Sequence, residues 1–153
     1  MGEVNLPSII PSYVYTLFAS IIVGTILICA CGLSTLSVRH EAERQHLSSI
    51  AEYVTTKSLE LTSYASTDNL TSILRLDVPS LIGNQIYWIQ IANDSSTAWV
   101  EIGFGTTAKS SEYRAYIPSE VSASGLYVSG AGSAYLECYR GNSGVYLELS
   151  GGS

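Results

Sequence analysis

Length, composition and charge narrow the classes of protein to which this chain can belong. It has 153 residues, only seven Lys and Arg, and a formal net charge of −6. So few basic residues provide no basic stripe for phosphates, which disfavours nucleic acid as a partner and tight binding to anionic lipid heads. About 115 residues follow position 38, enough for one ordinary domain and too few for two.

An apolar run near the N-terminus is the most informative segment. No charged side chain occurs between Glu3 and Arg39. As a helix, the 27 residues from Ser12 to Val38 rise about 1.5 Å each. The total length of this helix exceeds the roughly 30 Å hydrocarbon core of a bilayer. We therefore expect a non-helical lead at 1–11 and then, at 12–38, an apolar helix in a membrane or in a filament core.

Two other interpretations of this run are less favoured. A cleaved signal peptide has a basic start and a shorter apolar stretch, whereas the first ten residues here contain no Lys or Arg. A buried helix of a soluble domain would need more surrounding chain than these residues supply. An anchored or assembled helix remains the main interpretation.

The composition becomes amphipathic after Val38, and no Gly or Pro interrupts residues 39–66. We expect the helix to continue through this segment as one rod from about 12 to 65. Apolar residues recur at helical spacing and form a stripe, which packs either on the chain's own distal domain or on identical helices. The stripe residues are Leu47, Ile50, Val54, Leu61 and Ala65.

Residues 67–153 have the pattern of a β domain. Short runs rich in β-branched and aromatic residues alternate with turn signals such as Pro79, Gly83 and the Asn93-Asp94-Ser95 tripeptide. The fold class expected is α+β: a long N-terminal helix followed by a small antiparallel β-sandwich, with a single curled sheet as the other arrangement that seven short strands fit. The predicted strands are Leu70–Val78, Gln85–Ala92, Ala98–Phe104, Tyr113–Ile117, Gly125–Ser129, Ala134–Arg140 and Val145–Leu149.

Seven tyrosines fall from Tyr87 onward. Tyrosine is enriched at protein–protein contacts, and it also has a high intrinsic β-propensity. Both explanations fit these positions, and the second is the simpler one.

Signals for catalysis or for metal and cofactor binding are thin. His40 and His46 are six residues apart, which turns them about 120° from the same helical face, so they do not form a metal pair. Gly-rich residues 129–133 do not match the frame of a serine nucleophile or a phosphate loop. We expect no enzymatic activity, no metal and no cofactor, and we interpret Cys29, Cys31 and Cys138 as small hydrophobic side chains.

Two tripeptides match the acceptor for N-linked glycans, beginning at Asn69 and Asn93. Either is used only if the β domain lies outside the cell. The positive-inside rule counts Arg39, Arg44 and Lys57 after the apolar run and would place that domain in the cytoplasm. The Ser/Thr/Gly/Tyr-rich, lysine-poor composition favours the outside, which we adopt.

The layout resembles that of type IV pilin-like proteins. The run LRLDVPSLIGNQIYWIQIANDSSTAWVEIGFG, followed by YIPSEVSASGLYVSGAGSAYLECY, is similar to the strand pattern of archaeal members. The resemblance implies a subunit or accessory protein of archaeal pili or archaella, with Glu3 at the place of the family's N-terminal glutamate. Prepilins of this superfamily usually have basic residues and a glycine before a cleavage site, and Met1-Gly2-Glu3 lacks that basic pattern.

Two functions therefore stand as expectations. The first is a filament subunit that contacts identical subunits through its helix, with Ser20 and Gly24 in a small-xxx-small frame that allows close approach. The second is a membrane-anchored, stator-like or surface binding protein with one uncleaved helix and another cell-surface protein as partner. The expected location is the cell membrane, with the C-terminal domain outside, or an extracellular filament.

Overall fold

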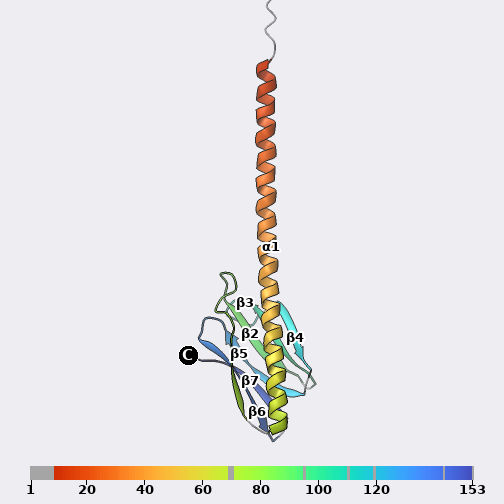
Figure 1. Cartoon of the computed structure of the whole chain (residues 1–153), viewed down its shortest axis with the longest axis vertical. Coiled ribbons are helices and arrows are strands. Elements are labelled where there is room, and N and C mark those ends of the chain that lie inside the picture. The colour runs from red at the N-terminus through yellow and green to blue at the C-terminus, as the bar shows by residue number, and fades with distance from the viewer. Residues whose placement is uncertain are drawn as a thin grey trace, which may run out of the picture. The chain divides into compact units, whose positions relative to one another are not determined.

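A computed structural model describes residues 9–68, 71–94, 96–109, 111–118, 120–142 and 144–152. One helix, α1 (Ile9–Asp68), is 60 residues long (Figure 1). The chain divides within this helix into two compact units, the first ending at Glu41 and the second beginning at Ala42. The second unit therefore contains both the amphipathic part of the helix and the whole β region.

The helix begins earlier than the sequence predicts. Helical geometry starts at Ile9 rather than at residue 12, so Pro11 lies in the first turn. That position tolerates proline because the first N–H groups of a helix have no intrahelical partner, and the fixed φ of proline suits helix geometry. The predicted continuity of the helix from residue 12 to 65 is confirmed.

Seven strands follow the helix and form one sheet in the order β1-β6-β7-β5-β2-β3-β4. All neighbouring strands are antiparallel except β5 and β7, which are parallel. The strands are β1 (Ser72–Leu76), β2 (Tyr87–Asn93), β3 (Ala98–Phe104), β4 (Tyr113–Ile117), β5 (Val121–Val128), β6 (Ser133–Gly141) and β7 (Gly144–Gly152).

The α+β class is confirmed, whereas a sandwich of two packed sheets is not. The strands form a single sheet, and the layer against its apolar face is the second half of α1. A sheet must bury one apolar face, and the helical stripe supplies the cover that a second sheet would otherwise provide. Figure 1 shows this part of α1 lying along the sheet.

The core lies between this stripe and alternate residues of the strands. On the helix, Leu47, Ala51 and Val54 are fully buried, and they belong to one cluster with the central strands. Cross-strand pairs such as Ile89–Ile102 and Leu136–Leu149 face the helix. Along β5 and β6, buried residues alternate with more exposed ones, as in a sheet with one covered face, whereas Trp88 on β2 is also buried on the opposite face.

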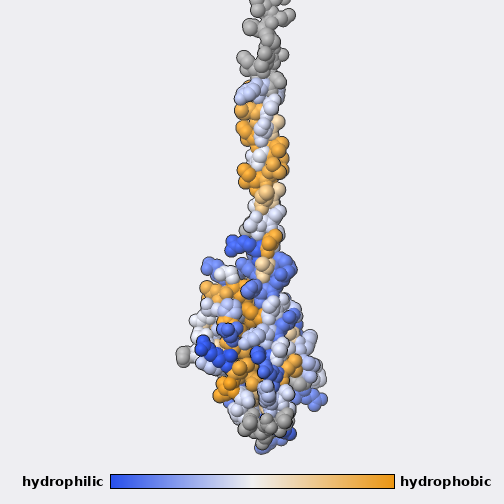
Figure 2. Space-filling model, in the orientation of Figure 1, coloured by the Kyte–Doolittle hydropathy of each residue, from blue (hydrophilic) through white to orange (hydrophobic). Residues whose placement is uncertain are grey.

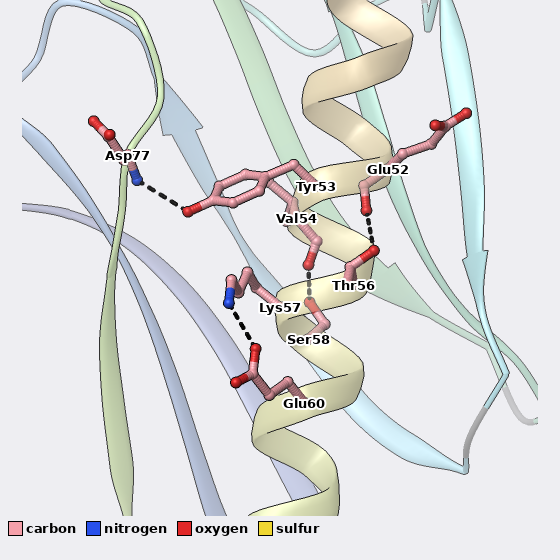
Figure 3. Close-up of polar contacts among 8 residues, drawn as sticks. All are labelled: Glu52, Tyr53, Val54, Thr56, Lys57, Ser58, Glu60 and Asp77. Carbon is pink, nitrogen blue, oxygen red and sulfur yellow. Dashed lines mark hydrogen bonds and ion pairs between the residues drawn. The ribbon is translucent and has the colours of Figure 1, made fainter.

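Polar contacts tie the helix to the strands outside the core. The backbone N–H of Asp77 donates to the Tyr53 hydroxyl at 3.4 Å, as Figure 3 shows. Near the C-terminal end of α1, the Arg140 guanidinium donates to the carbonyl of Ser66 at 3.0 Å. These contacts fix how the helix lies on the sheet within the second unit.

Gly125 permits the close approach of β5 and β7, the parallel pair in the middle of the sheet. Its φ is 133°, and a Cβ at this position would lie 2.1 Å from the carbonyl oxygen of Leu149 on β7. Only glycine accepts both the conformation and the close approach. The strand also starts at Val121 rather than at Gly125 as predicted, because small residues such as Ser122 and Ser124 weaken the sequence signal for a strand.

Candidate interaction surfaces

The first half of α1 presents apolar side chains around its circumference. This segment is long and apolar enough to cross a membrane, and none of its most apolar window is buried within the chain. Large side chains including Phe18, Ile22 and Leu27 are exposed. Figure 2 shows apolar side chains dominating this part of the helix. In water such a surface would be costly, at about 25 cal/mol per Å².

The hydroxyl groups of this segment make hydrogen bonds within their own helix. Ser20 donates to the Thr16 carbonyl at 2.7 Å, and Thr25 donates to the Ile21 carbonyl at 2.8 Å. Ser34 and Thr35 donate in the same way to carbonyls four residues earlier. A hydroxyl satisfied by its own backbone avoids most of the penalty of entering an apolar medium, so the segment suits a non-aqueous environment.

Ser20 and Gly24 lie one turn apart on this segment. A Cβ at Gly24 would meet no atom within 4 Å, so nothing in the chain itself requires glycine there. The predicted contact of these two residues with a neighbouring helix stays a prediction.

The other predicted helix-packing residues lie elsewhere. Leu47, Ile50, Val54 and Leu61 are buried on the chain's own sheet, together with Ala65. This is the first of the two alternatives for the stripe, so these side chains are not available for contacts between helices. The stripe pattern does not distinguish a sheet from a second helix as the covering partner, because both demand the same apolar positions.

The sheet face turned away from α1 carries aromatic residues on β3 and β4. Arg114 lies over the Trp99 ring, with its guanidinium carbon 5.0 Å from the ring centroid, and forms an ion pair with Glu101. Tyr116 pairs with Trp99 across the strands and is 59% exposed. A stacked arginine beside an exposed aromatic ring is the composition typical of protein–protein contacts.

The indole N–H groups of this face are unusual. Those of Trp88 and Trp99 are buried and have no acceptor among the residues that the structure describes. Buried indole N–H groups usually find a partner.

A second group of aromatic residues lies on the same face over β6 and β7. The rings of Tyr139 and Tyr146 stack with centroids 5.4 Å apart and an interplanar angle of 9°. Beside them Glu137 and Glu148 form a cross-strand pair of like charges. Such a pair is unfavourable in a sheet, at about 0.2–1 kcal/mol.

Tyrosine rings also cover two glycines of these strands. A Cβ at Gly141 would lie 2.7 Å from the Tyr146 ring, and one at Gly152 would lie 2.6 Å from the Tyr135 ring. Part of the tyrosine pattern therefore serves packing within the sheet. This supports the simpler of the two explanations of the tyrosine content for these positions.

Of the two predicted glycan acceptors, Asn69 lies outside the described residues. Asn93 ends β2, is exposed, and lines an open pocket of about 510 Å³ with Asp94 and Glu120. Its side-chain oxygen accepts from the Ala123 N–H at 3.2 Å, and its amide nitrogen donates to the Asp94 carbonyl at 3.1 Å. Both ends of the Asn93 side-chain amide are thus hydrogen-bonded within the chain, and its use as a glycan acceptor stays a prediction.

The Asp94 carboxylate organises the turn that closes this pocket. Its Oδ1 accepts from the backbone N–H groups of Ser96 and Thr97, both at 2.8 Å. These hydrogen bonds to the charged form hold the pKa of Asp94 below its usual value. Asp94 is therefore a structural acceptor in the turn between β2 and β3.

Arrangements suited to catalysis are scarce in the described part of the chain. A search of it finds no group of three or more His, Cys, Asp or Glu side chains that could hold a metal ion. Cys138 is buried in the core, and burial raises the pKa of its thiol, an effect partly offset by a hydrogen bond with Thr62. A buried, protonated thiol is a poor nucleophile.

Comparison with known proteins gives no assignment, because no family model, no curated protein and no solved structure matches this chain. The fold is that of an α+β protein with one long helix and one seven-stranded sheet. The first half of the helix is apolar, and the second, amphipathic half covers the sheet.

Sequence reasoning missed the contact between Arg114 and Trp99. Alternation along the strand at 98–104 would have placed Trp99 and Glu101 on one face. The pairing of this strand with the next, which brings Arg114 to that face, required the register.

Proposed function

We propose that this chain is a non-catalytic structural subunit of a surface filament, similar in layout to archaeal type IV pilins. The apolar half of α1 forms the core of the assembly with identical subunits, and the sheet unit lies outside. Before assembly the same helix is held in the lipid bilayer. The proposal needs no cofactor or metal.

The observation that carries this proposal is the apolar surface of α1 before Val38. It is exposed within the chain, and its hydroxyls bond to their own helix. The part of the helix from Ala42 onward belongs instead to a compact unit, where its apolar stripe packs on the sheet. A helix with this surface requires lipid or other helices around it. A filament core of identical helices supplies such a cover.

Substitutions at Gly24 test the two environments separately. Arginine at this position costs about 2.5–3.5 kcal/mol at the centre of a membrane helix, so Gly24→Arg should remove the protein from both membranes and fibres. Leucine is favourable in lipid but keeps helices apart. Gly24→Leu should therefore remain in the membrane fraction and disappear from fibres.

Thr56→Arg is the matched control, because Thr56 is exposed on the polar side of the same helix. The Thr56→Arg chain should be found in the membrane fraction and in fibres to the same extent as the parent chain. Fibres that form equally well from the Gly24→Leu chain would contradict a helical core built through this position.

A second candidate function is an accessory protein anchored by its helix, whose sheet binds another surface protein. The arginine-stacked aromatic face of β3 and β4 favours it. The test is Tyr116→Glu, which places a charge on an exposed ring position of that face. Loss of a stoichiometric partner on purification, with Tyr64→Glu as an exposed control on α1, would support this candidate.

A further inference from the structure

The segment between β1 and β2 contains a closed turn. Ile82 and Gln85 exchange two backbone hydrogen bonds, of 3.1 and 3.0 Å, and form an isolated antiparallel bridge. Gly83 has a φ of 61°, the left-handed conformation that such a turn requires. The Ile82 side chain is buried. The segment is therefore a defined structural element.

This turn rests on Glu43 of the helix. The Gln85 side-chain amide donates to Glu43 Oε2 at 3.1 Å. A Cβ at Gly83 would lie 2.6 Å from Glu43 Oε1, so the glycine also permits the close approach of the carboxylate. Glu43 is the second residue of the sheet-containing unit. The turn thus lies at the end of that unit where the helix enters it.

Two large aliphatic side chains flank the turn and are exposed. Leu81 is 45% exposed and Ile86 is 40% exposed. The backbone on both sides is held in place: the Tyr87 hydroxyl donates to the Pro79 carbonyl, and the Gly105 N–H donates to the Ile86 carbonyl at 2.8 Å. A rigid turn thus presents two aliphatic side chains to the surroundings.

The distance along the chain from the apolar segment to this turn is short. Val38 ends the uncharged run, and Glu43 follows five residues later in the same helix. Five helical residues rise about 7.5 Å. A bilayer of about 40–45 Å around a core of about 30 Å has a headgroup layer of similar depth, roughly 5–8 Å on each side. Glu43 therefore reaches the outer part of that layer when Val38 marks the edge of the hydrocarbon core.

We propose that residues 79–86 form a membrane-contacting turn, with Leu81 and Ile86 inserted at the headgroup level of the bilayer in which the apolar half of α1 resides. This inference rests on the membrane location in the proposed function. Aliphatic side chains gain free energy at the boundary between headgroups and acyl chains.

A fluorescent probe at position 81 tests this contact in the full chain. Leu81→Cys is made in a Cys29→Ala, Cys31→Ala background, and Cys138 stays unlabelled because it is buried. The matched control is Leu126→Cys, because Leu126 is 46% exposed on the sheet face away from the helix. Both chains are labelled with an environment-sensitive maleimide and reconstituted into phosphatidylcholine–phosphatidylglycerol vesicles. Lipids with a nitroxide near the headgroup and aqueous iodide serve as quenchers.

The probe at position 81 should emit at shorter wavelength than the probe at 126 and lose a larger share of its fluorescence to the nitroxide lipid. Ile86→Cys should repeat this result. Equal, iodide-accessible emission at 81 and 126 would overturn the inference. Shielding of position 81 from both quenchers would also overturn it, because a second copy would then cover the turn.

Flotation of the vesicles separates this inference from the proposed function. Protein that floats with the vesicles but has a water-exposed probe at 81 refutes the turn alone. Protein that does not float refutes the membrane location, and the turn contact with it.

Discussion

The guanidinium carbon of Arg114 lies 5.0 Å from the centroid of the Trp99 ring, on the sheet face that α1 does not cover. The two residues come from adjacent strands, and Glu101 on the same strand as Trp99 forms an ion pair with the same guanidinium. β4 is an edge strand, so this contact helps to hold the edge of the sheet.

Removal of the arginine should loosen that edge. A cation–π contact at an exposed site contributes about 0.5–1 kcal/mol, and an exposed ion pair contributes about 0.2–1 kcal/mol. We expect Arg114→Ala to lower the free energy of unfolding by about 1 kcal/mol in urea titrations of the full chain in detergent. Arg114→Lys should recover only part of this, because a lysine ammonium lacks the planar stacking surface.

The control for this variant is Arg75→Ala at the opposite edge of the sheet, on β1. A surface substitution of this kind should stay within about 0.5 kcal/mol of the parent. An equal loss in both variants would show that net charge, rather than the contact with Trp99, sets the effect.

A cavity at Leu47 should destabilise the second unit. The side chain is fully buried between α1 and the sheet, and replacement of a buried leucine by alanine costs about 2–5 kcal/mol. Leu47→Ala should therefore lower the unfolding midpoint in urea strongly, whereas Ser49→Ala, at an exposed position two residues on, should not. Unchanged stability accompanied by altered oligomeric state would mean that the stripe packs on sister helices instead.

The turn after β2 should weaken at acid pH. Backbone hydrogen bonds from Ser96 and Thr97 lower the folded-state pKa of Asp94 from 3.8, so the unfolded chain binds its proton first as pH falls. The contribution of the Asp94 carboxylate to the free energy of unfolding is complete above its pKa in the unfolded chain. This contribution is lost as pH falls through its pKa in the folded chain. The protection factors of the amides at 96 and 97, taken relative to intrinsic exchange at each pH, should fall below pH 3.8 in the parent.

Asp94→Asn should remove this pH dependence, because the amide cannot titrate. Ser96→Ala retains the carboxylate and loses only a hydroxyl contact of 3.2 Å, so its pH dependence should match that of the parent. A Ser96→Ala chain without the acid-induced change would contradict the assignment to Asp94.

Cys138 should report on opening of the core. Cys29 and Cys31 are exposed, so the test uses a Cys29→Ala, Cys31→Ala background. Burial raises the pKa of the Cys138 thiol and also blocks access, so alkylation by a maleimide at pH 8 should be slow in this folded chain. The rate should rise with urea in parallel with unfolding followed by tryptophan fluorescence. A rapid reaction without denaturant would show that the cover formed by α1 opens locally.

The sequence predicts much of this fold because its strongest signals are local. The apolar run, the helical stripe at Leu47–Ala65 and the strands Ala98–Phe104 and Tyr113–Ile117 all follow from periodicity and propensity. The prediction of a second sheet came from the number of strands. It was not confirmed because nothing in the strands themselves indicates that the stripe of α1 covers the whole apolar face.

Nonlocal features lay beyond the sequence for a physical reason. The parallel pairing of β5 with β7 depends on the approach of Gly125 to Leu149, two residues that are 24 positions apart. The contact of Glu43 with the turn at Gly83 and Gln85 likewise joins segments about 40 residues apart. Such pairings follow from the overall packing and leave no periodic trace.

Electron microscopy of material sheared from cells that express this chain, combined with N-terminal sequencing of the protein in it, decides whether the chain builds a filament. We expect fibres in which this chain is the main component and its apolar helices form the core. A chain found entirely in the membrane fraction as a monomer, and absent from any fibre, would contradict it.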